Sequence, residues 1–125
     1  MNRNAVAAAP AALLTLTVCL ALAGCYPKVG AAPGPVANET LEIARAKWAD
    51  ATPETVELGR QAFLKHCNAC HGYPDLVALP EAKWPGTAKR MASKAKLSGE
   101  DAEHLTRFVL ALRATEAGAA PAAKP

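Results

Sequence analysis

The sequence is poor in aromatic residues, which make up 5% of its 125 residues. Two Phe, two Trp and two Tyr cannot build a large conventional core. Hydrophobic residues reach 51%, but alanine and one N-terminal apolar run supply much of that total. A folded part of roughly 70 to 80 residues is only marginally stable by itself. The composition therefore favours a small domain that gains stability from more than its own side chains.

The chain also lacks a strong charge imbalance, internal repeats and any convincing strand pattern. Its formal net charge is +3, and nothing indicates nucleic-acid binding. We find no paired carboxylates and no nucleophile–base set of the kind that catalytic sites use. We therefore do not expect an enzyme in its own right. The helical patterns described below predict an all-α fold.

Cysteine is scarce, and only Cys67 and Cys70 lie close together outside the N-terminal apolar region. With the next residue, His71, they form the C-x-x-C-H spacing that marks attachment of a c-type haem. Two thiols at this spacing add across the haem vinyl groups, and the adjacent imidazole becomes the proximal iron ligand. One covalently bound haem would also supply the apolar mass that the side chains lack.

The same motif leaves two other interpretations open. A bare C-x-x-C occurs in thioredoxin-like redox pairs and in half of many zinc sites. A zinc site that includes His66 and His71 is conceivable, but no second Cys pair follows, and the remaining histidine, His104, is isolated. A thioredoxin-like domain would need strands around the motif. Haem attachment is favoured, and zinc or dithiol chemistry is the alternative.

The N-terminal region has the features of a secretory signal. A short polar segment with Arg3 precedes an apolar run over residues 5–22, and small residues precede Cys25. The L-A-G-C sequence that ends at Cys25 resembles the lipobox of bacterial lipoprotein signals. The resemblance implies that residues 1–24 are a lipoprotein signal peptide and that Cys25 carries lipid. An uncleaved membrane anchor is the alternative, since about 18 apolar residues approach the length of a span.

Lipid on Cys25 would attach the protein to a membrane outside the cytoplasm, on the periplasmic side in a bacterium. Tyr26 rather than an aspartate follows the cysteine, and in the lipoprotein family this favours the outer membrane. Residues 25–38 are rich in proline and glycine and predict a flexible tether. The thirteen residues after Cys25, residues 26–38, reach about 45 Å when extended, which would let the domain rotate.

Helical segments are predicted within a domain of residues 39–115. The first covers residues 39–50, with Asn38 as its cap. Thr52 and Pro53 are a capping threonine and a first-turn proline, and we expect this second helix to continue to Cys70. Gly59 in mid-helix costs about 1 kcal/mol relative to alanine, which a close approach by another helix would explain.

The second half of the domain is predicted as a loop and two more helices. Residues 72–80 form the loop, and Pro85-Gly86 separates a short piece at 81–84 from a helix over 88–96 that Thr87 caps. Ser98 opens a capping-box-like start for a last helix over 99–115. Residues 116–125 are predicted as a disordered tail. The loop residues expected to cover a haem face are Leu76, Val77 and Leu79, and the carbonyl of Pro74 or Pro80 is expected to fix the tautomer of His71.

A low-spin haem iron needs a ligand on its second face. The only methionine outside the signal segment is Met91, and thioether ligation favours the reduced iron. The competing interpretation is that Met91 fills the core. Other candidates are His104, which we expect at the surface, and Lys94 or Lys96, which would need deprotonation. With no such ligand, the site would suit binding of a small ligand.

The sequence resembles a known family, the bacterial class I c-type cytochromes of the small membrane-tethered kind. The resemblance rests on C-N-A-C-H-G, preceded by T-P-E-T-V-E-L-G-R-Q-A-F and followed by W-P-G-T-A-K-R-M and L-S-G-E-D-A-E-H-L-T-R-F-V-L. It implies a small helical domain wrapped around one haem c, with His71 as proximal and Met91 as distal ligand. It also implies a contact between the first and last helices, formed by Gly59, Phe63 and Phe108. The sequence departs from the family in one respect, since Met91 lies in a helix-like segment.

These features predict a monomeric, monohaem electron carrier that is tethered to the membrane and exchanges electrons with redox partner proteins. Its iron would cycle between Fe(III) and Fe(II). One alternative is a sensor with an open sixth site, and another is a haem subunit of a larger dehydrogenase or oxidase. Basic residues are expected to surround the haem edge and steer acidic partners, although they could equally be a solvated helix face. They are Lys65, Lys83, Lys89, Arg90, Lys94 and Lys96.

Overall fold

The structure, a computed structural model, describes residues 30–97 and 99–119. The predictions for the signal peptide, for Cys25 and for the last six residues lie outside the described residues. Every regular element within the described ranges is a helix, which confirms the all-α class. No helix in this part of the chain is long and apolar enough to cross a bilayer. The elements are α2 (Asn38–Lys47), α3 (Pro53–His66), η2 (Leu76–Ala78), η3 (Glu81–Lys83), α4 (Trp84–Lys94) and α5 (Gly99–Ala119).

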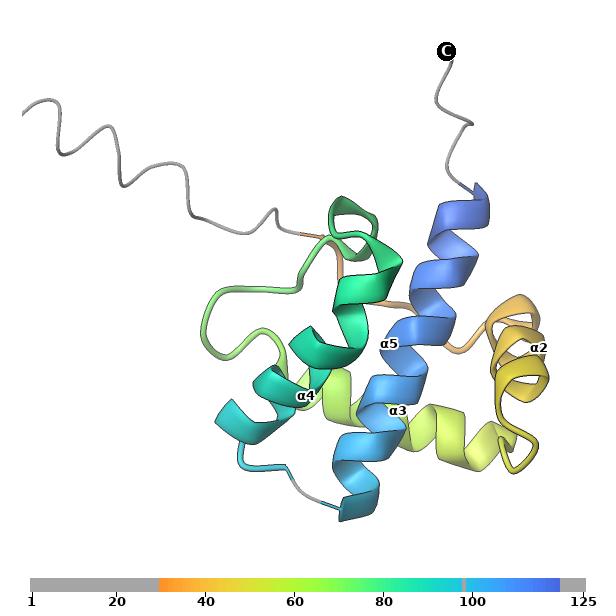
Figure 1. The fold of residues 1–125 in the computed structure, drawn as a ribbon, viewed down its shortest axis with the longest axis horizontal. Coiled ribbons are helices and arrows are strands. Elements are labelled where there is room, and N and C mark those ends of the chain that lie inside the picture. The colour runs from red at the N-terminus through yellow and green to blue at the C-terminus, as the bar shows by residue number, and fades with distance from the viewer. Residues whose placement is uncertain (1–29, 98, 120–125) are drawn as a thin grey trace, which may run out of the picture.

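Helix α5 is the central element of the domain. It packs against α2, α3, α4 and η2, and Figure 1 shows it between α2 on one side and α4 on the other. Its inner face carries Leu105, Phe108 and Val109, all nearly inaccessible to solvent. These residues follow the i, i+3, i+4 spacing of one helix face, as the sequence predicts.

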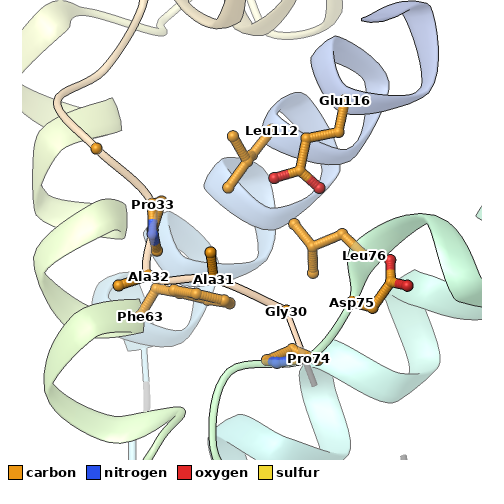
Figure 2. Close-up of a pocket in the computed structure, with 11 residues that line it drawn as sticks. Gly30, Ala31, Ala32, Pro33, Phe63, Pro74, Asp75, Leu76, Leu112 and Glu116 are labelled. Carbon is orange, nitrogen blue, oxygen red and sulfur yellow. The ribbon is translucent and has the colours of Figure 1, made fainter. Parts of the chain in front are cut away.

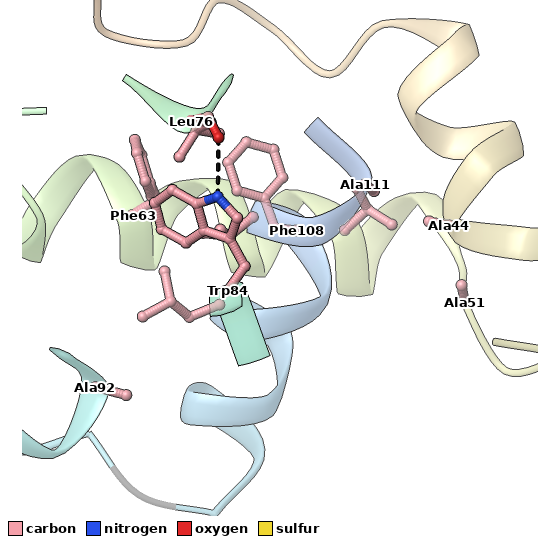
Figure 3. Close-up of a cluster of buried hydrophobic side chains, with 11 residues drawn as sticks. Ala44, Ala51, Phe63, Leu76, Trp84, Ala92, Phe108 and Ala111 are labelled. Atoms are coloured by element: carbon pink, nitrogen blue, oxygen red, sulfur yellow. Dashed lines mark hydrogen bonds between the residues drawn. The ribbon is translucent and has the colours of Figure 1, made fainter. Parts of the chain in front are cut away.

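The core combines a few aromatic rings with small residues. Phe63 and Phe108 meet edge to face, with ring centroids 5.9 Å apart. Trp84 packs beside them (Figure 3), and its indole N–H donates to the carbonyl oxygen of Leu76 at 2.8 Å. This bond satisfies the one polar group of a buried indole.

The predicted contact of α3 with α5 at Gly59 is confirmed. A Cβ placed on Gly59 would lie 2.6 Å from the Cβ of Phe108 and would also meet the carbonyl oxygen of His104. Both neighbours belong to α5, so only glycine lets the two helices approach this closely. The same region contains the predicted partners Phe63 and Phe108.

The start of α3 is as predicted, and its end is not. The Thr55 backbone N–H donates to the Thr52 hydroxyl at 3.2 Å, and the Thr52 N–H donates to the Thr55 hydroxyl at 2.9 Å. Pro53 follows in the first turn, where no backbone N–H is needed. The helix ends at His66 rather than at Cys70, and residues 67–71 form turns. The cysteine pair therefore lies just beyond the helix.

Other predicted helix boundaries need correction. Ala37, not Asn38, is the N-cap of α2. Helix α4 begins at Trp84, so Pro85 does not break it and Thr87 does not cap it. A proline in a first turn removes only an N–H that has no helical partner. Helix α5 continues through Ala119, so residues 116–119 of the predicted tail are helical.

The described part of the predicted tether packs against the domain. We call residues 30–36 the strap. The Gly30 N–H donates to the carbonyl oxygen of Tyr73 at 2.7 Å, and Arg60 Nη1 donates to the carbonyl oxygen of Pro33 at 3.5 Å. Val36 packs against the core. These contacts place the strap against the domain, and the flexibility of the tether stays a prediction.

Candidate functional site

The cysteine pair follows α3 directly. Cys67 is the C-cap of this helix, and its backbone N–H donates to the carbonyl oxygen of Phe63 at 2.9 Å. Its side chain is partly buried against the core, whereas Cys70 is exposed. Both carry free thiols. The pair thus presents one thiol at the core boundary and one at the surface, three residues apart in the same turns.

Burial raises the pKa of the Cys67 thiol to about 11. Catalytic dithiols depend on the opposite shift, because the thiolate is the attacking species. At neutral pH, Cys67 is therefore almost entirely protonated. This environment disfavours Cys67 as the attacking thiol of a redox pair.

His71 lies in the same turns, and one ring nitrogen has a fixed partner. Its Nδ1 lies 3.1 Å from the carbonyl oxygen of Gly72. With the proton on Nδ1, this nitrogen donates to the carbonyl and Nε2 keeps a free lone pair, as in many metal-binding histidines. The partner is Gly72 rather than Pro74 or Pro80, so that prediction is wrong. Gly72 has a φ of +78°, a conformation that glycine adopts without strain.

Tyr73 holds the histidine turn against α3. Its ring stacks on Phe63 with centroids 5.5 Å apart, and its hydroxyl donates to the carbonyl oxygen of Leu64 at 3.1 Å. Tyr73 lies two residues after His71, so this anchor restricts where the imidazole can lie. The sequence alone does not predict this role, because nothing in the local sequence pairs Tyr73 with a residue of the preceding helix nine positions earlier.

Met91 comes from a separate element. It lies inside α4 and is partly buried, between the buried residues Ala88 and Ala92. The helix-like segment noted in the sequence is therefore a true helix. Cys67, Cys70 and His71 share one set of turns, and Met91 can join them only through the packing of α4.

The competing distal ligands lie in other settings. His104 is partly buried beside Gly59 and close to Asp50, so it belongs to the crossing of α3 and α5. Its Nδ1 is buried and has no hydrogen-bond partner among the described residues. Lys94 and Lys96 are exposed. The predicted surface position of His104 is therefore only partly right.

Of the three residues expected to cover a haem face, Leu76 is buried and Leu79 is partly buried. Val77 is 42% exposed and does not belong to the core. The carboxylate of the preceding Asp75 caps η2 by accepting from the backbone N–H groups of Val77 and Ala78. The cap fixes the direction of this short helix, which places Leu76 inside and Val77 outside.

A cavity of about 370 Å³ lies between the strap, α3, η2 and α5 (Figure 2). Phe63, Leu76 and Leu112 form its apolar walls, and Asp75 and Glu116 add two carboxylates. Burial and the negative charge of Asp75 raise the pKa of Glu116. Among the described residues, neither Cys67, Cys70, His71 nor Met91 lines this cavity, so it is separate from the predicted ligand set.

The donor groups themselves fit a covalently bound haem. Two free thiols and one imidazole whose Nδ1 faces a backbone carbonyl lie within five residues of one turn region. Residues 30–97 and 99–119 contain no group of three or more His, Cys, Asp or Glu side chains that could hold a metal ion. The zinc alternative with His66 and His71 therefore gains no support.

The predicted basic residues lie at the surface. All six are exposed, and none belongs to an ion pair within the described part of the chain. Helix α4 contains no acidic residue, and Lys89, Arg90 and Lys94 project from it. Lys83 and Lys96 flank the helix. We call these five residues the α4 basic face.

Comparison of the chain with protein-family models, with curated proteins and with solved structures finds no match.

Proposed function

We propose that the chain is a monohaem c-type cytochrome that works as a membrane-tethered periplasmic electron carrier. The observation that carries the proposal is the arrangement at the end of α3. Cys67 and Cys70 present free thiols, and the adjacent His71 directs Nδ1 to a backbone carbonyl. This set combines the two thioether positions and the proximal nitrogen that a haem c requires.

Each residue has one role in this proposal. Cys67 and Cys70 hold the porphyrin covalently, and His71 offers Nε2 to the iron while the Gly72 carbonyl keeps Nδ1 protonated. Met91 would offer a thioether from α4 as the second iron ligand. When bound, the haem supplies a one-electron Fe(III)/Fe(II) couple. The residues around it hold the ligands in place and perform no bond chemistry on a substrate.

The α4 basic face supports a carrier that meets acidic partners. Its cations are exposed and lack acidic neighbours on the same helix. Exposed charges of one sign accelerate encounter with an oppositely charged surface, and salt weakens this effect within a Debye length of about 10 Å at 0.1 M. We therefore expect the rate of electron exchange with an acidic partner to fall as ionic strength rises.

The test is the optical spectrum of the exported protein, oxidised and reduced, for the wild type and for Met91→Ala. The proposal predicts a low-spin c-type spectrum with a far-red sulfur-to-iron band that the variant loses. Ser93→Ala is a matched control, since it alters an exposed residue of the same helix without removing an iron donor. It should retain the band.

Three other outcomes would change or overturn the proposal. A low-spin spectrum that persists in Met91→Ala would remove Met91 as ligand and direct attention to His104 or a lysine. A high-spin wild type that binds carbon monoxide rapidly in the ferrous state would favour the sensor alternative. Absence of any haem would overturn the proposal.

A further inference from the structure

We propose that the docked strap orients the domain on the membrane, with η2 toward the bilayer and the C-terminal end of α4 toward the aqueous side. The inference rests on the proposed lipidation of Cys25. It goes beyond the proposed electron-carrier function because it assigns a membrane-facing end and a partner-facing end to the domain.

Gly30 lies in close contact with the backbone of the Tyr73–Asp75 segment. Its N–H donates to the Tyr73 carbonyl oxygen at 2.7 Å. A Cβ placed on Gly30 would lie 2.6 Å from the carbonyl oxygen of Pro74 and 3.1 Å from the Cα of Asp75. Both neighbours are backbone atoms, so a side chain cannot be accommodated by a rotamer change. Glycine at this position therefore lets the strap lie directly on the Tyr73–Asp75 segment.

The length of chain between the lipid on Cys25 and the contact made by Gly30 limits how far the domain can move from the bilayer. Five residue steps separate Cys25 from Gly30, which span at most about 18 Å. A domain of some 90 residues measures about 30 Å across. The link is therefore shorter than the domain, and the end that carries Gly30 must stay near the bilayer. A free tether of thirteen residues would exceed the diameter and would permit rotation.

The C-terminal end of the α4 basic face lies away from this end of the domain. Trp84 at the start of α4 bonds to Leu76 of η2, and Lys94 lies about 15 Å further along the helix axis. In Figure 1 the described chain begins near η2, at the end where α5 finishes, whereas α4 ends at the opposite side of the domain. Lys94 and Lys96 therefore lie on the side away from the anchor.

The strap thus directs Lys94 and Lys96, at the C-terminal end of the α4 basic face, toward acidic proteins that approach from the aqueous phase. It also limits the distance between the turn that contains His71 and the bilayer. Gly30 contacts Tyr73, and Tyr73 follows His71 by two residues, so the backbones of Gly30 and His71 lie within about 10 Å of each other. Release of the strap would remove both constraints without any change to the ligand set.

The test places a nitroxide near each end of the full-length lipidated protein in vesicles with gadolinium-chelating lipid headgroups. Val77→Cys reports on η2, where the side chain is exposed, and Lys94→Cys reports on the end of α4. We expect gadolinium to enhance nitroxide relaxation several-fold more at position 77 than at position 94. Equal enhancement at both positions would overturn the proposal, and so would failure of the protein to bind vesicles through a lipid.

Two variants remove the orientation by different routes. Gly30→Val should detach the strap, and Gly34→Val is its control, because nothing lies within 4 Å of a Cβ at Gly34. Insertion of eight Gly/Ser residues after Pro27 lengthens the link without touching the strap or the fold. We expect the difference between positions 77 and 94 to shrink in Gly30→Val and in the insertion variant and to persist in Gly34→Val. Persistence in the insertion variant would overturn the proposal.

For a haem-free chain the comparison uses a Cys67→Ala/Cys70→Ala background, because the label would otherwise also react with these two free thiols. A normal c-type spectrum with equal relaxation at both ends would reject the orientation alone. A haem-free chain that still shows the difference would reject the electron-carrier function alone. The mass of each labelled sample verifies that one nitroxide is present per chain.

Discussion

Replacement of Gly59 by alanine should destabilise the domain, because α3 and α5 meet there without room for a side chain. The new Cβ would lie 2.6 Å from the Cβ of Phe108 and would also press on the carbonyl oxygen of His104. Carbon atoms in good contact are about 3.5 to 4.0 Å apart. The helices would therefore have to separate by about 1 Å, or α3 would have to shift along α5.

The expected size follows from two opposing effects. Overpacking of a well-filled site costs about 1 to 3 kcal/mol, and here the upper end applies because neither neighbour is the tip of a flexible side chain. Alanine in place of glycine within a helix stabilises by about 1 kcal/mol. The net loss is about 2 kcal/mol in the free energy of unfolding. For a domain of this size it lowers Tm by roughly 8 to 16 °C.

The assay is thermal unfolding followed by circular dichroism, with Gly86→Ala as the control. Gly86 lies in the first turn of α4, and nothing lies within 4 Å of a Cβ there. This variant gains the same helix propensity without a clash, so its Tm should equal or exceed that of the wild type. A Gly59→Ala protein as stable as Gly86→Ala would refute the reasoning from close approach.

Three further predictions concern stability. Trp84→Phe removes the buried donor to the Leu76 carbonyl and should cost about 1 to 3 kcal/mol in urea unfolding; an unchanged midpoint would contradict this. Burial and the charge of Asp75 raise the pKa of Glu116 above its usual 4.5, so its stabilising contribution is lost as pH rises through the raised pKa. Glu116→Gln should therefore be more stable than the wild type at pH 7 and equal to it near pH 3, and the opposite order would contradict the assignment. Thr52→Ala removes the cap of α3 and should cost about 1 kcal/mol, detectable as a lower urea midpoint.

The sequence predicts the features of the fold that depend on residues close together along the chain. The threonine–proline start of α3 required only residues 52 and 53, because the cap and the first-turn proline act within one turn. The amphipathic spacing of Leu105, Phe108 and Val109 identified the buried face of α5. Gly59 is informative because glycine destabilises a helix, so its presence indicates a close contact with another helix. In the structure that contact is with Phe108 of α5.

Contacts between distant segments could not be predicted in the same way. The strap has a composition typical of a flexible linker, yet Gly30 fits against Pro74, forty-four positions away. Pro85 looked like a helix breaker, because proline in an interior turn and proline in a first turn have the same local sequence signature.

For the candidate site, the sequence identified the cysteines and His71 but not the groups that hold them. The Gly72 carbonyl replaced the predicted proline carbonyls because a positive φ turns the chain directly after the histidine. Tyr73 was missed because its partners, Phe63 and Leu64, belong to the preceding helix. Whether Met91 completes the ligand set stays a prediction.

The most direct test of the central claim is mass spectrometry of the protein recovered from the membrane fraction, after denaturation and digestion with trypsin. Cleavage after Lys65 and Lys83 releases the peptide that contains both cysteines and His71. The account predicts that this peptide carries one covalently bound haem and does not react with iodoacetamide. A haem-free peptide that is alkylated at Cys67 and Cys70 would contradict the account.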